Sequence, residues 1–265
     1  MRKRVFCILS IFLILSLQLL ALNFTENKKI KEIFEKNKLE GTFVLYDSEN
    51  NSFTGYNKKR AEVQFYPAST FKIYSSLIAL NTGAVKNVDD IFYKYNGEKV
   101  FLKSWAQDSN LRYAIKVSQV PVYQSLARKI GVKKMQEEIN KLNFGNKKIG
   151  KEVDQFWLRG PLKISAIEQC ELLTKLANNE LPYSKDIQKQ VQEITILEKA
   201  EDWTLHGKTG WGTSNIKIPI GWFVGWIEKD GRIYSFAINL DMKESKNLPK
   251  REEMAKEALK TLNII

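Results

Sequence analysis

The chemistry open to this chain is limited by its single histidine, His206. A multi-histidine zinc site, or the H-E-x-x-H helix of metalloproteases, needs at least two imidazoles, so most metal-dependent hydrolysis is excluded. A serine nucleophile without an imidazole needs another base, and a lysine can serve if its amine is kept neutral. Serine and lysine occur three residues apart twice, as Ser69 with Lys72 and as Ser214 with Lys217. These two pairs are the candidate catalytic groups.

Only the first pair has a context that brings its side chains together. A spacing of three puts two side chains on one face of a helix, and the pattern over residues 69–80 predicts a helix. Lys217 is followed within two residues by Pro219, which opposes a helix there. Ser69 at a helix start lies near backbone N–H groups that can stabilise an oxyanion. We expect Ser69 to be the nucleophile; an ordinary serine at a helix start, with an exposed lysine one turn later, would show the same spacing.

Three further motifs follow this pair in order along the chain. They are Ser118-Gln-Val120, Trp157-Leu-Arg-Gly160 and Lys208-Thr-Gly210. S-x-x-K, then a second serine motif, then K-T-G is the ordered signature of serine enzymes that are acylated by β-lactams. A phosphate-binding loop ending at Thr209 is excluded, because Asp202 stands where that loop needs glycine.

With these motifs the chain resembles a class D β-lactamase of the oxacillinase type, from about Gly41 to the C-terminus. The resemblance also rests on Pro67-Ala-Ser-Thr-Phe-Lys72, Phe144-Gly-Asn146, Gln155-Phe-Trp-Leu158, Gly221-Trp-Phe-Val-Gly-Trp226 and Leu248-Pro-Lys-Arg251. Phe144 departs from the family, which often has tyrosine there, so any contact made by that hydroxyl is lost. The resemblance implies hydrolysis of penicillin-type antibiotics, and with it β-lactam resistance.

The resemblance implies a role for each motif. Ser69 attacks the lactam carbonyl and forms an acyl-enzyme, with Lys72 as general base after its carbamylation by carbon dioxide to N6-carboxylysine. Ser118 passes a proton to the departing lactam nitrogen. Val120 and Trp157 surround the carbamate with an apolar side chain and an indole N–H donor.

The resemblance also implies how substrate is bound. The backbone N–H groups of Ser69 and Trp211 form the oxyanion hole. The candidates for binding the substrate and its carboxylate are Lys208, Thr209, Gly210, Arg251 and Leu158. No metal and no cofactor are expected beyond carbon dioxide or bicarbonate for Lys72. His206, two residues before Lys208 and so about 7 Å along a strand, is expected to be structural.

Two other functions share these motifs. A β-lactam sensor domain binds the antibiotic and stays acylated, but such domains resemble the soluble end of a multi-span receptor, and this chain has one N-terminal apolar segment. A penicillin-binding transpeptidase or carboxypeptidase acts on cell-wall peptides. Val120, where related families have asparagine, disfavours it. Repeated turnover of a β-lactam would separate an enzyme from a sensor.

Periodicity and turn signals predict the elements that position these residues. Strands are expected over residues 41–47, 52–56, 203–209, 221–227 and 232–240, and helices over 27–39, 69–80 and 250–262, with a mostly helical stretch from 87 to 198. Asp230-Gly231 predicts a hairpin, and Ser165-Ala-Ile-Glu168 predicts a helix start with Cys170 on the buried face. The fold class is therefore α+β (α-β-α): an antiparallel sheet built from N- and C-terminal strands and flanked by helices, with an inserted helical lobe at about residues 84–200.

Composition and the N-terminus bound the rest. With 43% hydrophobic and 27% charged residues, the chain is in the range of one large or two small domains with a real core. The resemblance implies a single catalytic domain over residues 22–265, as a monomer or homodimer. The 42 Lys and Arg residues are interleaved with acids, so no nucleic-acid partner is expected despite the net charge of +12. Arg2-Lys-Arg4 followed by an apolar run predicts a signal peptide over residues 1–21 and export to the periplasm; an uncleaved membrane anchor is the alternative.

Overall fold

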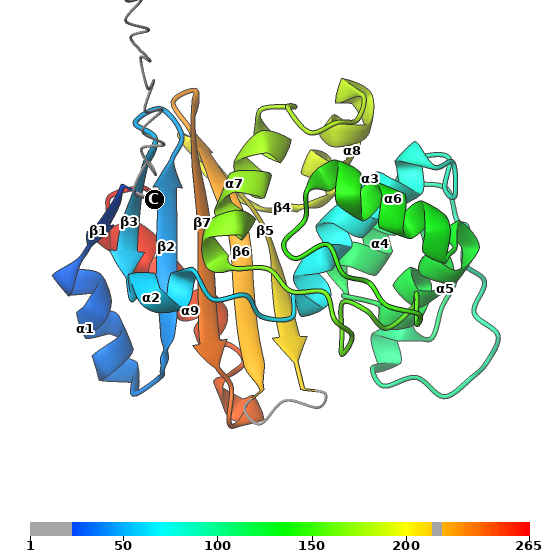
Figure 1. The fold of residues 1–265 in the computed structure, drawn as a ribbon, viewed down its shortest axis with the longest axis horizontal. Coiled ribbons are helices and arrows are strands. Elements are labelled where there is room, and N and C mark those ends of the chain that lie inside the picture. The colour runs from blue at the N-terminus through cyan, green and yellow to red at the C-terminus, as the bar shows by residue number, and fades with distance from the viewer. Residues whose placement is uncertain (1–22, 214–218) are drawn as a thin grey trace, which may run out of the picture.

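A seven-stranded sheet forms the centre of the protein in the computed structural model, which describes residues 23–213 and 219–265. Its strand order is β1-β3-β2-β7-β6-β5-β4 (Figure 1). The strands are β1 (Phe24–Glu26), β2 (Gly41–Asp47), β3 (Ser52–Tyr56), β4 (Ile196–Lys199), β5 (Trp203–Gly212), β6 (Ile220–Lys229) and β7 (Arg232–Asp241). The N-terminal hairpin thus lies beside the C-terminal strands, as the sequence predicts.

The sheet differs from the prediction at its two edges. Strand β1 pairs with β3 in parallel, so the sheet is mixed rather than wholly antiparallel. Strands β1 and β4 were not predicted, because each has only three or four residues and no clear alternation of apolar and polar side chains. The predicted hairpin between β6 and β7 is confirmed. Its two turn residues have φ of 50° at Asp230 and 75° at Gly231, the left-handed values of a two-residue hairpin turn.

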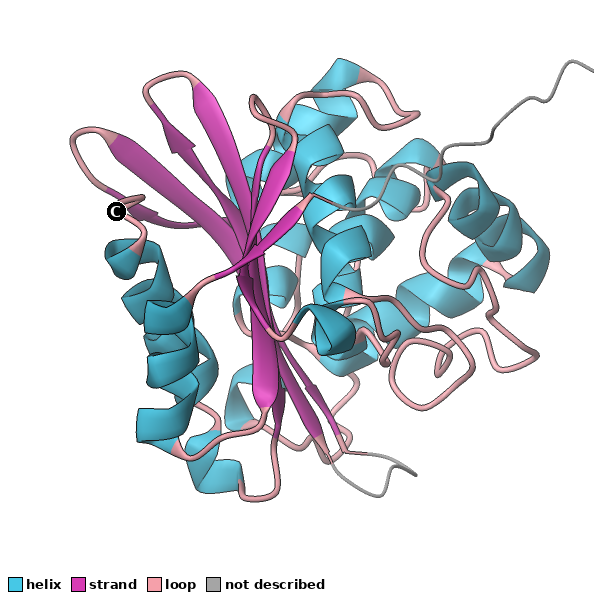
Figure 2. Cartoon of the chain, turned by 60° about the vertical axis from the view of Figure 1, so that its left-hand side comes forward, coloured by secondary structure: helices cyan, strands magenta, loops and turns pink. Residues whose placement is uncertain are grey.

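Helices cover both faces of the sheet (Figure 2). On one face, α1 (Lys28–Asn37) and α9 (Lys250–Thr261) pack side chains such as Phe34 and Leu259 against the sheet. On the other face lies α7 (Ala166–Ala177), whose buried Cys170 belongs to the larger core. The Ser165–Glu168 capping box that was predicted for its start is present in both directions. Helix α7 falls within the predicted helical lobe but packs on the sheet.

The remaining helices lie beyond α7 (Figure 1). They are α3 (Lys72–Asn81), α4 (Leu111–Lys116), α5 (Val120–Ile130), α6 (Val132–Leu142) and α8 (Lys185–Ile194), and the short α2 (Lys58–Ala61) precedes them. Helix α3 is central, because every residue from 72 to 80 is buried. Among the described residues, no helix is both long and apolar enough to cross a membrane.

Candidate active site

The predicted nucleophile lies on a tight turn between the sheet and α3. Residues Ala68–Phe71 form a single 3₁₀ turn and the α-helix begins only at Lys72, so the helix predicted from residue 69 is divided in two. Ala68 has a φ of 48°, an uncommon value for a residue with a Cβ, and its N–H donates to the carbonyl of Trp157 at 2.9 Å. The turn is thus held in a sparsely populated conformation directly before Ser69.

Ser69 and Lys72 are joined by a hydrogen bond. The Lys72 Nζ donates to the Ser69 Oγ at 2.7 Å, and the Lys72 side chain is fully buried. Burial lowers the pKa of Lys72 well below its ordinary value, and the charge of Lys208 lowers it further. In the part of the chain that the structure describes, no carboxylate forms an ion pair with this amine. The site therefore favours a neutral amine next to the serine hydroxyl.

The indole of Trp157 lies in the same buried region. It is 1% exposed and stacks on Phe71, and its Nε1–H has no hydrogen-bond partner among the described residues. Phe144, the predicted departure from the family, is buried against the rings of Phe71 and Tyr74. A buried N–H without an acceptor lowers the stability of the folded protein, so an acceptor bound next to the Trp157 Nε1 would be stabilised.

A pocket of about 250 Å³ opens in front of Ser69. Its lining residues are Ser69, Phe101, Leu102, Trp105, Ser118, Val120, Leu158, Thr209, Gly210, Trp211, Leu248 and Arg251. Eight of these were predicted as site residues, whereas Lys72, Trp157 and Lys208 are buried. The structure thus brings together groups that are far apart in the sequence.

The apolar rim of this pocket was not predicted from the sequence. Phe101 and Leu102 are 78% and 42% exposed, and Phe101 contacts the ring of Trp105 at 6.1 Å between centroids. Their one signal is an apolar run, Val100-Phe-Leu102, within a polar segment. Leu248 begins the motif Leu248-Pro-Lys-Arg251 but was not predicted to be a site residue. Exposed apolar side chains around a pocket are a common feature of ligand sites.

Ser118 lies on the wall opposite the sheet, between α4 and α5. Its φ of 55° places it in the left-handed region. The backbone around it is held by buried polar contacts: the Trp105 Nε1 donates to the Val117 carbonyl at 3.0 Å, and the Gln119 Nε2 donates to the Trp105 carbonyl at 2.8 Å. The rim of the pocket and the Ser118 turn are therefore one connected unit.

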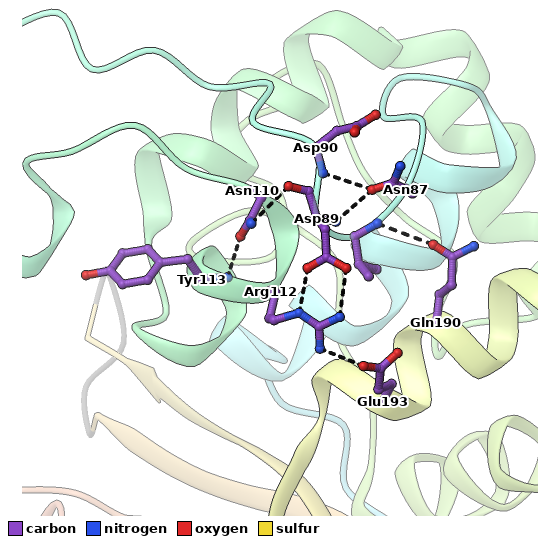
Figure 3. A network of polar contacts seen from close by, with 9 residues as sticks. Asn87, Asp89, Asp90, Asn110, Arg112, Tyr113, Gln190 and Glu193 are labelled. Carbon is purple, nitrogen blue, oxygen red and sulfur yellow. Dashed lines mark hydrogen bonds and ion pairs between the residues drawn. The ribbon is translucent and has the colours of Figure 1, made fainter.

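A charged network supports α4 from outside (Figure 3). The Arg112 guanidinium donates to both carboxylate oxygens of Asp89, at 2.6 and 2.9 Å, and pairs with Glu193 of α8 at 3.0 Å. Arg112, Glu193 and Lys208 also line a hollow of about 440 Å³ that shares Thr209 with the pocket at Ser69. The network ties together two helices that flank the site.

Strand β5 and helix α9 bring the cations. Burial lowers the pKa of Lys208 to about 8, and Arg251 contributes in the same direction. The Arg251 Nη1 donates to the Gly210 carbonyl at 2.8 Å, and its Nε donates to the Leu248 carbonyl at 2.6 Å. A Cβ at Gly221 would lie 2.8 Å from the Arg251 Cδ, so glycine there makes room for this side chain. Both cations are held in place by backbone contacts.

His206 has the surroundings of a structural residue, as predicted. Its ring is buried and stacks on Trp226 at 4.3 Å between centroids. The Nδ1 lies 2.9 Å from the Gln192 carbonyl, and the Nε2 lies 3.4 Å from Glu228. No group of three or more His, Cys, Asp or Glu side chains within residues 23–213 and 219–265 is arranged to hold a metal. Residues 1–21 and the Ser214–Lys217 pair lie outside the described residues.

Comparisons with known proteins agree with this geometry. A sequence model of the penicillin binding protein transpeptidase domain matches residues 36–260. OXA-48, a β-lactamase from Klebsiella pneumoniae, is 40% identical over 265 residues, 99% of each chain, and OXA-5 from Pseudomonas aeruginosa is 40% identical over 243 residues, 91% of each. The crystal structure of FUS-1 (OXA-85), a class D β-lactamase from Fusobacterium nucleatum subsp. polymorphum, is 61% identical; the match covers 91% of this chain and all of that one, with a TM-score of 0.89.

This chain belongs to the class D β-lactamases. It is a hydrolase of β-lactams, as the sequence predicted, and it has the transpeptidase and serine β-lactamase fold. The match to the transpeptidase domain and the matches to class D enzymes are compatible, because the two groups share one fold. The ordered S-x-x-K, serine and K-T-G motifs of the sequence all lie in or beside one pocket.

Proposed function

We propose that this enzyme hydrolyses the lactam amide of penicillin-type antibiotics through an acyl-enzyme on Ser69. The Ser69 Oγ attacks the lactam carbonyl, its proton passes to the base at Lys72, and the C–N bond breaks as the nitrogen receives a proton through Ser118. A water molecule, deprotonated by the same base, then cleaves the ester. The observation that carries the proposal is the 2.7 Å contact between Ser69 and a fully buried lysine without a carboxylate partner in the described residues.

Carbamylation of Lys72 fits the residues present. Only a neutral amine reacts with carbon dioxide, and burial disfavours the ammonium form of Lys72. The Trp157 Nε1–H is a buried donor without a partner among the described residues, which a carbamate oxygen would satisfy, and Val120 adds an apolar side chain. When formed, the carbamate supplies an anionic oxygen as general base.

Export through a signal peptide over residues 1–21 belongs to the same proposal, and N-terminal sequencing of the secreted protein tests it.

Two backbone N–H groups are suited to stabilise the oxyanion. The Ser69 N–H lies in the 3₁₀ turn at the pocket. The described chain has no cis peptide, so the Trp211 N–H points opposite to the Gly210 carbonyl, which accepts from Arg251. Each such donor, placed in advance, contributes about 10²- to 10³-fold to the rate.

The charged and apolar walls of the pocket suit the two ends of a penicillin. Thr209 and Arg251 line the pocket, Lys208 lines the adjoining hollow, and in this proposal the three hold the carboxylate; the guanidinium retains N–H donors beyond its two backbone contacts. The apolar rim, with Trp105 and Leu158, suits an aryl or alkyl side chain.

Ser69→Ala tests the proposal most directly. Turnover of a chromogenic cephalosporin and of benzylpenicillin is expected to vanish, and intact mass is expected to show no covalent adduct. The parent is expected to complete many turnovers, with no loss in EDTA. A single stoichiometric burst from the parent would indicate a sensor instead. An adduct on the Ser69→Ala protein would assign the nucleophile elsewhere, with Ser214 the first candidate.

A further inference from the structure

A buried glutamine outside the pocket contacts the turn that carries the nucleophile. Gln169, on α7, is completely buried, and its Nε2 donates to the Thr70 Oγ1 at 2.9 Å. Thr70, also buried, is the neighbour of Ser69, and its Oγ1 donates to the Pro67 carbonyl at 2.7 Å. The Thr70 N–H reaches the same carbonyl at 3.2 Å. A series of hydrogen bonds thus connects α7 to Pro67, the residue directly before the 3₁₀ turn.

The donor and acceptor in each of these hydrogen bonds follow from the single hydrogen of the Thr70 hydroxyl. The Thr70 hydroxyl has one hydrogen, and it is given to Pro67, so Thr70 must accept from its other neighbour. Gln169 must therefore present its amide N–H₂, which leaves its Oε1 without a partner in the described residues. Both contacts together leave the Thr70 side chain a single orientation.

That orientation aims the Thr70 methyl group at strand β5. A Cβ built on Gly210 would lie 3.1 Å from the Thr70 Cγ2 and 3.1 Å from the Pro67 carbonyl oxygen. The turn with Ser69 and the strand with Trp211 are therefore in direct contact at Gly210, where glycine leaves no side chain between them. The Thr70 methyl is the side-chain atom of the turn nearest to this point, at the same distance as the Pro67 carbonyl oxygen.

We propose that Gln169 and Thr70 are positioning residues that set the width of the oxyanion hole. Gln169 holds Thr70 in one rotamer, and the Thr70 methyl sets the spacing between the N–H groups of Ser69 and Trp211. This inference rests on the proposed function, in which those two groups bind the developing oxyanion. A displacement of about 1 Å at such a site reduces the rate by about 10²-fold.

The test compares Gln169→Leu with a matched variant on the same helix. Thr174→Val removes another buried α7 hydrogen bond, to the Ser235 hydroxyl at 2.7 Å, that does not touch the turn. Both variants are expected to lower Tm. Only Gln169→Leu is expected to slow acylation of Ser69, by about 10- to 100-fold, and to weaken binding of a boronic acid transition-state analogue by a similar factor while the Kd of non-covalent binding stays unchanged.

Thr70→Ser is the second variant, in case Gln169→Leu does not fold. It keeps the hydroxyl and removes only the methyl, so the boronic acid is expected to bind more weakly with little change in Tm. Parent-like boronic acid affinity in Thr70→Ser, or Gln169→Leu kinetics equal to those of Thr174→Val, would overturn the inference. Failure of the proposed function is distinct, because the parent itself would then form no adduct on Ser69.

Discussion

Lys72 and Lys208 are both buried near the same pocket, but the groups that surround the two amines differ. Lys72 begins α3 among aromatic rings, with Ser69 as its hydrogen-bond partner and the face of Tyr123 at 5.3 Å. Lys208 lies on β5, bonded to the carbonyl of Thr209 at 3.1 Å, with the pocket's other cation, Arg251, close by. The contacts of Lys72 are thus one hydroxyl and an aromatic face, whereas Lys208 contacts a backbone carbonyl and lies near a second cation.

The pKa values follow these surroundings. Burial lowers the pKa of both lysines, but that of Lys208 falls only to about 8, so this amine is largely charged at neutral pH and can attract a carboxylate. Burial lowers the pKa of Lys72 well below its ordinary value and favours the neutral amine, which is the form that accepts a proton or reacts with carbon dioxide. In the proposed mechanism, one residue type thus acts as a base in one region and as a cation in the other.

Replacing each lysine by alanine tests this division with the largest expected effect. Lys72→Ala is expected to lower kcat by about 10³- to 10⁴-fold, because the general base is lost. Lys208→Ala is expected to raise KM for benzylpenicillin more than it lowers kcat, because it removes attraction for the carboxylate. Steady-state kinetics give both values. If both variants changed kcat and KM in the same proportion, the proposed difference in role between Lys72 and Lys208 would be contradicted.

A negative charge placed near Lys72 is expected to keep its amine protonated at neutral pH, like the amine of Lys208. Val120→Asp adds a carboxylate at the pocket, which stabilises the ammonium and raises its pKa by about 1 to 3 units. Activity at pH 7 is expected to fall by about 10- to 100-fold and to recover partly at higher pH. Val120→Asn, without the charge, is the control. A pH profile identical in the two variants would contradict the electrostatic reason.

The indole donor is expected to matter for Lys72 alone. Trp157→Phe keeps an aromatic ring and removes the unpaired N–H, at a cost of about 1.5 to 3 kcal/mol for a hydrogen bond to a charged acceptor. The corresponding loss of activity, about 10- to 100-fold, is expected to be recovered in part by added bicarbonate. Rates at several bicarbonate concentrations measure this. Equal bicarbonate dependence in parent and variant would argue against a carbamate held by Trp157.

The smallest expected effect concerns the titration of Lys208. Its pKa of about 8 means that the ammonium is present below pH 8 and is lost above it. The KM for benzylpenicillin is therefore expected to be constant below about pH 7 and to rise about three- to tenfold above pH 8. Lys208→Arg, which stays charged, is expected to flatten this rise. A rise that persists in the arginine variant would assign the titration to another group.

The proposed oxyanion donors and cations were predicted from motifs, but their neighbours were not. Lys208-Thr-Gly210 and Ser118-Gln-Val120 are visible in the sequence, and the structure places them at the pocket with Ser69. The rim formed by Phe101 and Leu102 has only a short apolar run as its signal, and the contact from Gln169 to Thr70 has no local pattern at all. An exposed aromatic in a loop and a glutamine in a helix are ordinary until folding shows what they touch.

The sequence by itself determined the local features of this protein. The spacing of Ser69 and Lys72, the capping box at Ser165 and the turn at Asp230-Gly231 depend on backbone geometry within a few residues, so they can be read from the chain. Only the tertiary structure decided the parallel pairing of β1 and the approach of Arg251 to Gly210, and it alone left Lys72 buried without an acidic partner in the described residues. The physical reason is that burial, desolvation and long-range contacts depend on segments far apart in sequence, and these set the pKa of a lysine.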